Sequence, residues 1–177
     1  MKALHLVIGL IFLGTTSFVC AQNQTPAMAT AYPNLPAQAK EYGDAFVRGD
    51  VEKLVELTYP KYIEIAGGKQ KLISVGNATR KQFERDAMQL ISWMPIEVTQ
   101  FLEESGSLYA VAPMAMRTKG RGFETEDYDC LIAVSNDRGE HWTFVSSTCV
   151  RLKDAFPQVA EKLVLCSEKQ PVRLAQP

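Results

Sequence analysis

The hydrophobic repeat changes once along the chain, close to Pro95. Before this residue, apolar side chains recur every three or four positions, as on one face of a helix. After it they recur at every second position, as on one face of a strand. Helices that all precede the strands are typical of an α+β domain. The sequence therefore predicts N-terminal helices packed on a curved antiparallel sheet of about four long strands.

Three helices are expected before the sheet. The first ends at Gly49, whose lack of a side chain suits a helix end, and Asp50 is a suitable cap for the second, which must end by Pro60. The third helix is expected over residues 69–90, with solvated cations on its polar face. Residues 62–66, between the second and third helices, are expected to be short and irregular or extended.

The strands should follow without interruption by a further long helix. They are expected at residues 96–103, 108–116, 123–135 and 142–150. Pro113 lacks a backbone donor, so a bulge or bend is expected at that point. A short amphipathic helix is expected at residues 156–165, near the end of the domain.

Residues 1–21 have the features of a secretory signal peptide. Lys2 supplies a positive charge, residues 6–13 are apolar, and Ala21 is a small residue before the expected cleavage site. The apolar run is shorter than the roughly 20 residues that a membrane-spanning helix needs. Attachment of lipid to Cys20 is an alternative, although Val19 is bulky for such a signal. The protein is therefore expected to be exported, and to be periplasmic or secreted after cleavage following Ala21.

Cleavage would leave 156 residues with a net charge of −2, one histidine and three cysteines. We expect a flexible leader at residues 22–33, a single domain at 34–166 and a C-terminal tail at 167–177. Nearly balanced charge argues against nucleic acid or an anionic membrane as the main partner. No second apolar run approaches the length of a membrane span, so none is expected after cleavage.

Three stretches resemble the NTF2-like (cystatin-like, SnoaL-type) superfamily, and most closely its uncharacterised exported bacterial members. They are the end of the first helix with the second (residues 46–60), the start of the third (67–69) and the hairpin AVSNDRGEHWTFV (133–145). The resemblance covers nearly all of residues 34–152. It implies a conical space between sheet and helices that serves as an enzyme site, a ligand pocket or only a core, so the fold does not decide the function.

The resemblance suggests a carboxylate base inside the cone. The weak candidates are Asp127 and Asp129, with Tyr128 as a hydrogen-bond donor to a developing oxyanion. Alternation places both carboxylates on the strand face opposite the more apolar set that includes Tyr128 and Cys130. We therefore expect the carboxylates to face solvent or a helix edge. A bulge between them would reverse this expectation.

Other chemistry-bearing residues are few. His141 lies in a charged turn with no nucleophile at a suitable spacing, and Lys119 with Arg121 forms a turn that is expected to be solvated. The sequence has no motif for a metal or nucleotide, so no metal or cofactor is expected. A set of aromatic and methionine side chains could line a pocket for an apolar ligand or simply fill the core: Trp93, Met94, Met114, Met116, Tyr128, Trp142 and Phe144.

The three cysteines that follow the signal allow one disulfide. We favour Cys149 with Cys166, because this bond would hold the C-terminal helix to the sheet, and leave Cys130 as a buried thiol. A Cys130–Cys149 pair and three reduced thiols are the alternatives.

These features favour a non-enzymatic exported domain that binds a small apolar molecule or an exported protein. A homodimer through the open face of the sheet is a further expectation. The alternatives are a cofactor-free isomerase or dehydratase that works in the cone, and an inhibitor or immunity protein of an exported enzyme. Asp127, Asp129 and Glu64 are the carboxylates whose placement separates the enzyme from the binding domain.

Overall fold

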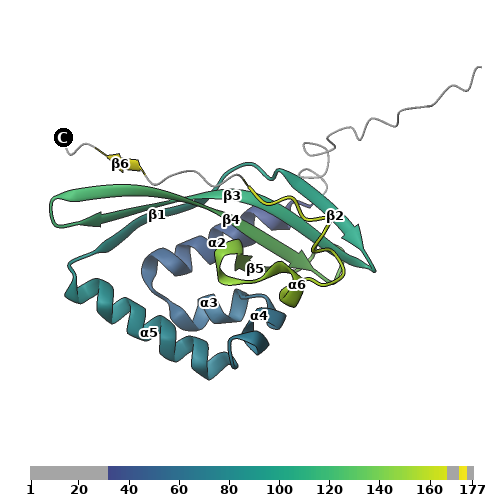
Figure 1. The fold of residues 1–177 in the computed structure, drawn as a ribbon, viewed down its shortest axis with the longest axis horizontal. Helices are drawn as coiled ribbons and strands as arrows, with labels where there is room; N and C mark the ends of the chain where they lie inside the picture. The colour runs from purple at the N-terminus through teal and green to yellow at the C-terminus, as the bar shows by residue number, and fades with distance from the viewer. Residues whose placement is uncertain (1–31, 167–171, 175–177) are drawn as a thin grey trace, which may run out of the picture.

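The computed structural model describes residues 32–166 and 172–174. The predicted signal peptide, most of the leader and most of the tail lie outside these residues. The helices come first and are followed by a strongly curled antiparallel sheet that forms a half-barrel, which confirms the α+β prediction (Figure 1). The described helices that precede the sheet are α2 (Asn34–Arg48), α3 (Val51–Leu57), α4 (Pro60–Ile65) and α5 (Lys69–Arg85). None of the described helices is both long and apolar enough to span a bilayer.

The first helix ends and the second begins at the residues that the sequence predicts. Gly49 adopts a left-handed conformation, with φ of 67°, and its N–H caps α2. The Asp50 side chain accepts a 3.1 Å hydrogen bond from the N–H of Lys53 at the start of α3. The expected extended piece at residues 62–66 is wrong, because Pro60 starts α4 there. The third predicted helix also ends early, since Ala87 has a positive φ of 52° and β1 begins at Gln89.

A long hairpin forms the centre of the sheet. It consists of β3 (Ser107–Gly120) and β4 (Phe123–Ser135), which pair continuously from Leu108↔Ser135 to Gly120↔Phe123. The remaining strands are β1 (Gln89–Pro95), β2 (Gln100–Glu104), β5 (Thr143–Ser146) and β6 (Val172–Leu174). β1 and β2 pair with the same edge of β3, whereas β5 and β6 pair with β4. The strand predicted at 96–103 is therefore only partly present: residues 96–99 form a break, β2 begins at Gln100, and β1 lies before Ile96, where no strand was expected.

The break in the neighbouring strand lies opposite Pro113. The pairing of β3 with β4 passes through Pro113↔Cys130 without a shift, so the expected bulge in β3 is absent. The carbonyl of Pro113 accepts a bond from Ile96 N–H, on the β1 side. Because N–H and C=O of a strand residue point to the same side, the missing donor of Pro113 also faces that side. Strand pairing on that side is lost between Pro95 and Gln100, and the central ladder stays intact.

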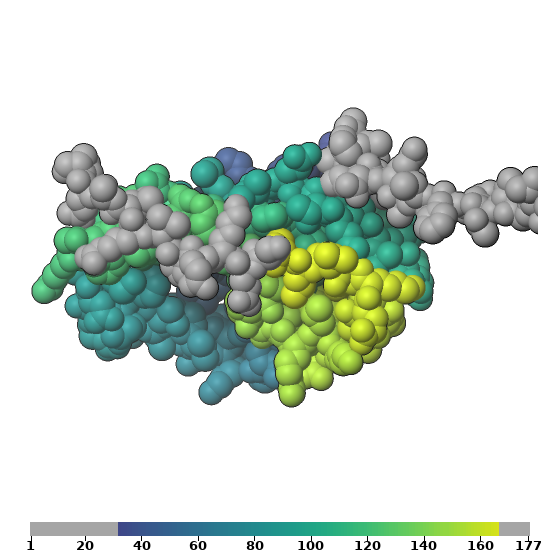
Figure 2. Space-filling view, turned by 45° about the horizontal axis from the view of Figure 1, so that its top comes forward, coloured from purple at the N-terminus to yellow at the C-terminus, as the bar shows by residue number. Residues whose placement is uncertain are grey.

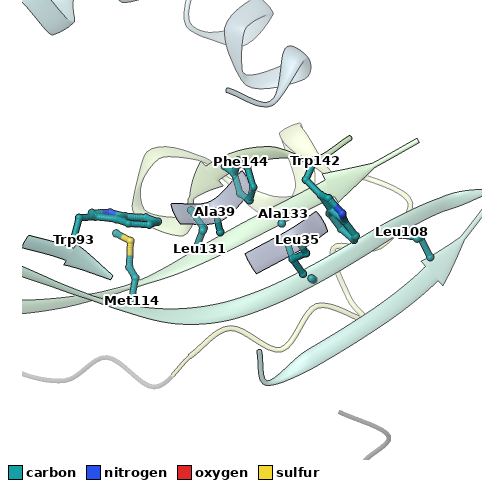
Figure 3. Packing of buried hydrophobic residues seen from close by; sticks show 10 residues of the cluster. Leu35, Ala39, Trp93, Leu108, Met114, Leu131, Ala133, Trp142 and Phe144 are labelled. Atoms are coloured by element: carbon teal, nitrogen blue, oxygen red, sulfur yellow. The ribbon is translucent and has the colours of Figure 1, made fainter. Parts of the chain in front are cut away.

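The inner face of the sheet, which we define as the face toward α2, forms the first part of the core. Leu35 and Ala39 of α2 pack there against side chains from four strands, which Figure 3 shows at close range. The buried strand residues are Trp93, Leu108, Ala110, Met114, Leu131, Ala133 and Phe144, with Trp142 beside them. Close approach of α2 requires Gly43, because a Cβ there would lie 2.1 Å from an atom of the Trp93 ring.

The opposite face, the outer face, is covered by a C-terminal strap that we define as residues 152–166. Phe156, Val159 and Leu163 of the strap are buried against the sheet, and Phe156 also stacks on Tyr59 at 4.9 Å between ring centroids. Figure 2 shows the strap in yellow-green beside the teal strands. Both faces of the sheet are therefore covered, the inner face by α2 and the outer face by the strap. The expected homodimer required an open face, and the strap leaves less of that face accessible.

The strap differs from the predicted helix at residues 156–165. It begins with the short helix α6 (Leu152–Ala155), and residues 157–162 form turns. Pro157 explains the difference, because the proline ring makes the helical conformation unfavourable for the residue before it. Phe156 indeed has a φ of −135° and a ψ of 52°.

The strap is joined to the sheet by a disulfide between Cys130 and Cys166. The two Cα atoms are 5.6 Å apart, and Cys149 is a free, exposed thiol. The predicted Cys149–Cys166 bond is therefore wrong. Cys130 lies on the outer face of β4, where the strap passes. Cys149 lies in the 3-10 turn η1 (Ser147–Cys149), because β5 ends at Ser146, earlier than predicted.

Candidate functional site

Polar side chains from six parts of the chain meet where the inner face of the sheet reaches β5. We call them the polar cluster, which comprises Tyr42 (α2), Thr58 (after α3), Tyr62 (α4), Asp129 (β4), Ser146 (β5) and Ser147, Thr148 and Cys149 (η1). The segment after α3 is held against β5 by a 2.9 Å bond from Tyr59 N–H to the carbonyl of Phe144. This bond brings α4 beside η1.

Asp129 is the centre of the hydrogen bonds in the polar cluster. Its carboxylate accepts bonds from the hydroxyls of Ser146, Ser147 and Thr148, at 3.0 Å for Ser147 and 2.9 Å for Thr148. It also accepts a 2.6 Å bond from the N–H of Cys130. Four donors occupy the two oxygens, so the carboxylate is committed to holding the η1 turn. Asp129 thereby fixes the place of Cys149, the last residue of that turn.

Tyr42 joins the polar cluster to the apolar core. Its ring packs against Trp93 and Phe144, with centroid distances of 5.6 and 5.3 Å. Burial raises the pKa of the Tyr42 hydroxyl well above its ordinary value, and the nearby Cys149, Tyr62 and Asp129 raise it further. A hydrogen bond with the buried Thr58 opposes part of this rise in pKa. The phenol therefore stays protonated and can donate a hydrogen bond at any physiological pH.

Tyr62 and Cys149 form the outer edge of the polar cluster. Burial raises the pKa of the Tyr62 hydroxyl, and its charge interaction and hydrogen bond with Cys149 raise it further. Tyr62 is half-buried and Cys149 is exposed, so this edge is accessible to solvent. The polar cluster therefore presents two protonated phenols and a thiol beside aromatic rings.

The chain's three candidate catalytic residues do not come together. Tyr128 lies on the outer face, where its hydroxyl donates to Glu126, whereas Asp127 and Asp129 lie on the inner face with Leu131 and Ala133. Asp129 is half-buried against the 3-10 turn η1, so of the two expected surroundings, solvent or a helix edge, it has the second. Both strand faces are covered, and alternation alone could not show which cover was the helical one. Glu64 is exposed and pairs with Lys61 at 2.9 Å.

The seven pocket candidates divide into three groups. Trp93, Met114, Trp142 and Phe144 are buried in the core beneath α2, and Met116 is partly buried against them. These five share the inner face. Met94 is 59% exposed, and Tyr128 lies on the outer face. The buried residues therefore support the position of Tyr42 instead of forming an open surface themselves.

The remaining candidates lie on the surface. The His141 side chain is 86% exposed, and its Nδ1 is 2.6 Å from Asp137 in the turn between β4 and β5. Lys119 and Arg121 are exposed at the hairpin between β3 and β4. Among the described residues, no group of three or more histidine, cysteine or acidic side chains could hold a metal ion.

Sequence reasoning did not single out Tyr42, Thr58 or Tyr62 as site residues. Tyr42 lies at helical spacing with the apolar residues Leu35 and Ala39, which is typical of a core position, and Tyr62 fell in a piece expected to be irregular or extended. The one available signal was the run of hydroxyls at residues 146–148 beside Cys149. Comparisons of the chain with protein-family models, curated proteins and solved structures gave no match.

Proposed function

We propose that this protein is an exported NTF2-like domain that binds a small molecule on the inner face of its sheet and does not transform it. The ligand would have an apolar body and a hydrogen-bond acceptor such as a carbonyl group. Tyr42 carries this proposal, because its protonated hydroxyl lies between the apolar rings of the core and the polar cluster.

Accessible apolar surface beside Tyr42 supports an apolar ligand body. Phe46 lies four residues further along α2, on the same helix face as Tyr42, and is 40% exposed. Helix α5 makes its main contacts with α3 and α4, not with the sheet. Phe46 therefore offers an accessible apolar ring one helical turn from Tyr42, which the body of a ligand could contact.

The state of Asp129 favours binding over catalysis. A general base needs a free lone pair within reach of a substrate proton. Asp129 accepts four bonds from the turn and backbone around it, and Tyr128 lies on the opposite face of the sheet. The cofactor-free isomerase that the resemblance also suggests would therefore lack both its base and its expected oxyanion donor.

A fluorescent naphthalene ketone, 6-propionyl-2-(dimethylamino)naphthalene, is a suitable probe because it combines an apolar body with a carbonyl acceptor. We expect the protein to bind it with a blue shift in emission. Tyr42→Phe should weaken binding about fivefold, the value of one neutral hydrogen bond of about 1 kcal/mol. The variant keeps the ring, so loss of affinity would report the hydroxyl.

Tyr59→Phe is the matched control, since it removes a phenol hydroxyl from a ring that stacks on the strap. It should leave the affinity for the probe unchanged. Absence of binding by the unaltered protein, or equal weakening by the two substitutions, would contradict the proposal.

A further inference from the structure

Helix α5 has an exposed cationic stripe, which we define as Lys71, Ser74, Ala78, Lys81 and Arg85. These residues are spaced by three and four positions, so they lie along one side of the helix. All five are exposed, and none of them is acidic. At 1.5 Å per residue the stripe is about 21 Å long. In Figure 1 α5 lies along the outside of the molecule, at the lower edge of the view.

The nearly balanced charge of the whole chain conceals this local excess. α5 contains five cations and a single acid, Glu84, whereas the chain has 19 cations and 20 acids. Glu84 pairs with Arg80, which lies outside the stripe. Asp86, just after the helix, accepts a 2.6 Å bond from Gln82. Within residues 32–166, no acidic side chain forms an ion pair with a cation of the stripe.

Lysines elsewhere in the described chain are mostly paired. Lys40, Lys53, Lys61, Lys153 and Lys162 each form an ion pair with an acidic side chain. The cations of the stripe differ from them in having no such partner. A surface that keeps three cations without counter-charges attracts anions over its whole length.

We infer that the cationic stripe of α5 docks the protein on an anionic phospholipid surface. The stripe has the charge for such a surface and lacks the aromatic anchors that form the centre of a specific protein interface. Small side chains at Ser74 and Ala78 let the helix approach a flat surface closely. Attraction of this kind acts between the cations and many mobile headgroups, so it needs no fitted pocket.

Sedimentation with lipid vesicles tests the inference. The protein, purified after export and with its N-terminus verified, should bind vesicles of phosphatidylethanolamine with phosphatidylglycerol, and should not bind phosphatidylcholine vesicles. Added salt should release it. The combined change Lys71→Gln, Lys81→Gln and Arg85→Gln should weaken binding on the order of 100-fold, since each cation contributes roughly fivefold.

The control variant Lys40→Gln, Lys61→Gln and Lys153→Gln removes the same charge from paired, exposed positions. It should keep vesicle binding within about threefold of the unaltered protein. Circular dichroism spectra would verify that both variants are folded. Failure of the unaltered protein to prefer anionic vesicles, or equal losses in the two variants, would overturn the inference. The probe titration with Tyr42→Phe is independent of this result.

Discussion

The disulfide between Cys130 and Cys166 should be a main contributor to stability. It closes a loop between residues 36 positions apart, which joins the strap to the centre of the sheet. In the chain-entropy treatment, a loop of this length stabilises the folded state by about 4 kcal/mol. Cys166→Ala breaks the bond while the buried Cys130 keeps its side chain. We expect this change to lower the free energy of unfolding by about that amount.

Urea denaturation followed by tryptophan fluorescence would measure the loss, because Trp93 and Trp142 are both buried in the folded protein. Cys149→Ala is the matched control. It removes an exposed thiol outside the disulfide and should change the free energy of unfolding by less than about 1 kcal/mol. The pairing that the sequence favoured, Cys149 with Cys166, predicts equal losses in the two variants. Equal losses, or no loss in Cys166→Ala, would contradict a stabilising bond between Cys130 and Cys166.

Three further predictions concern the packing of α2 and the turn after β4. Gln38→Ala should lower the free energy of unfolding by about 1–3 kcal/mol in urea denaturation, because Gln38 accepts a 2.7 Å bond from the backbone N–H of Trp142 and donates a 2.8 Å bond to the carbonyl of Glu140. Gly43→Ala should lower stability by about 3 kcal/mol or more, since its Cβ would overlap Trp93, and an unchanged melting temperature would contradict the packing of α2. Bonds from the backbone and side chain of His141, with one from Ser135, lower the pKa of Asp137 from 3.8 to about 2. A lowered folded-state pKa stabilises the protein above the unfolded value, and this contribution is lost as the pH falls from about 4 to 2. The difference in melting temperature between the protein and Asp137→Asn should therefore shrink over that range, and a constant difference would contradict the role of Asp137.

The central hairpin could be predicted from sequence because its signals are local. Residues 123–135 alternate clearly, Gly49 and Asp50 mark the boundary between α2 and α3, and the expected strand matches β4 from end to end. Propensity and alternation act within one segment, so they remain informative without knowledge of neighbours.

The cover on the outer face could not be predicted in the same way. Phe156, Val159 and Leu163 have helical spacing, yet Pro157 prevents a helix, and the same side chains are buried in turns instead. Once the strap covers this face, the side chains on both faces of β4 lie in apolar surroundings. The face of Asp129 and the partner of Cys166 depend on that cover, so the pattern of one strand could not decide them.

The polar cluster was hidden for a related reason. Its members come from α2, the residue after α3, α4, β4, β5 and the turn η1, so they are as far apart in sequence as Tyr42 and Cys149. No spacing rule joins residues whose contact depends on the curl of a sheet. The early end of β5 also places Cys149 in the cluster, because a strand that continued to Val150 would have carried Cys149 away from Tyr62.

A ligand that binds beside Tyr42 on the inner face would lie close to one of the two tryptophans and not to the other. The Trp93 ring contacts Tyr42, whereas the Trp142 indole donates a 3.0 Å bond to the carbonyl of Gly139. In a nitrogen–proton spectrum each indole N–H gives one signal. Adding the naphthalene ketone should shift the Trp93 signal progressively and leave the Trp142 signal in place. A shift confined to Trp142, or no shift in either signal at saturating probe, would contradict ligand binding beside Tyr42.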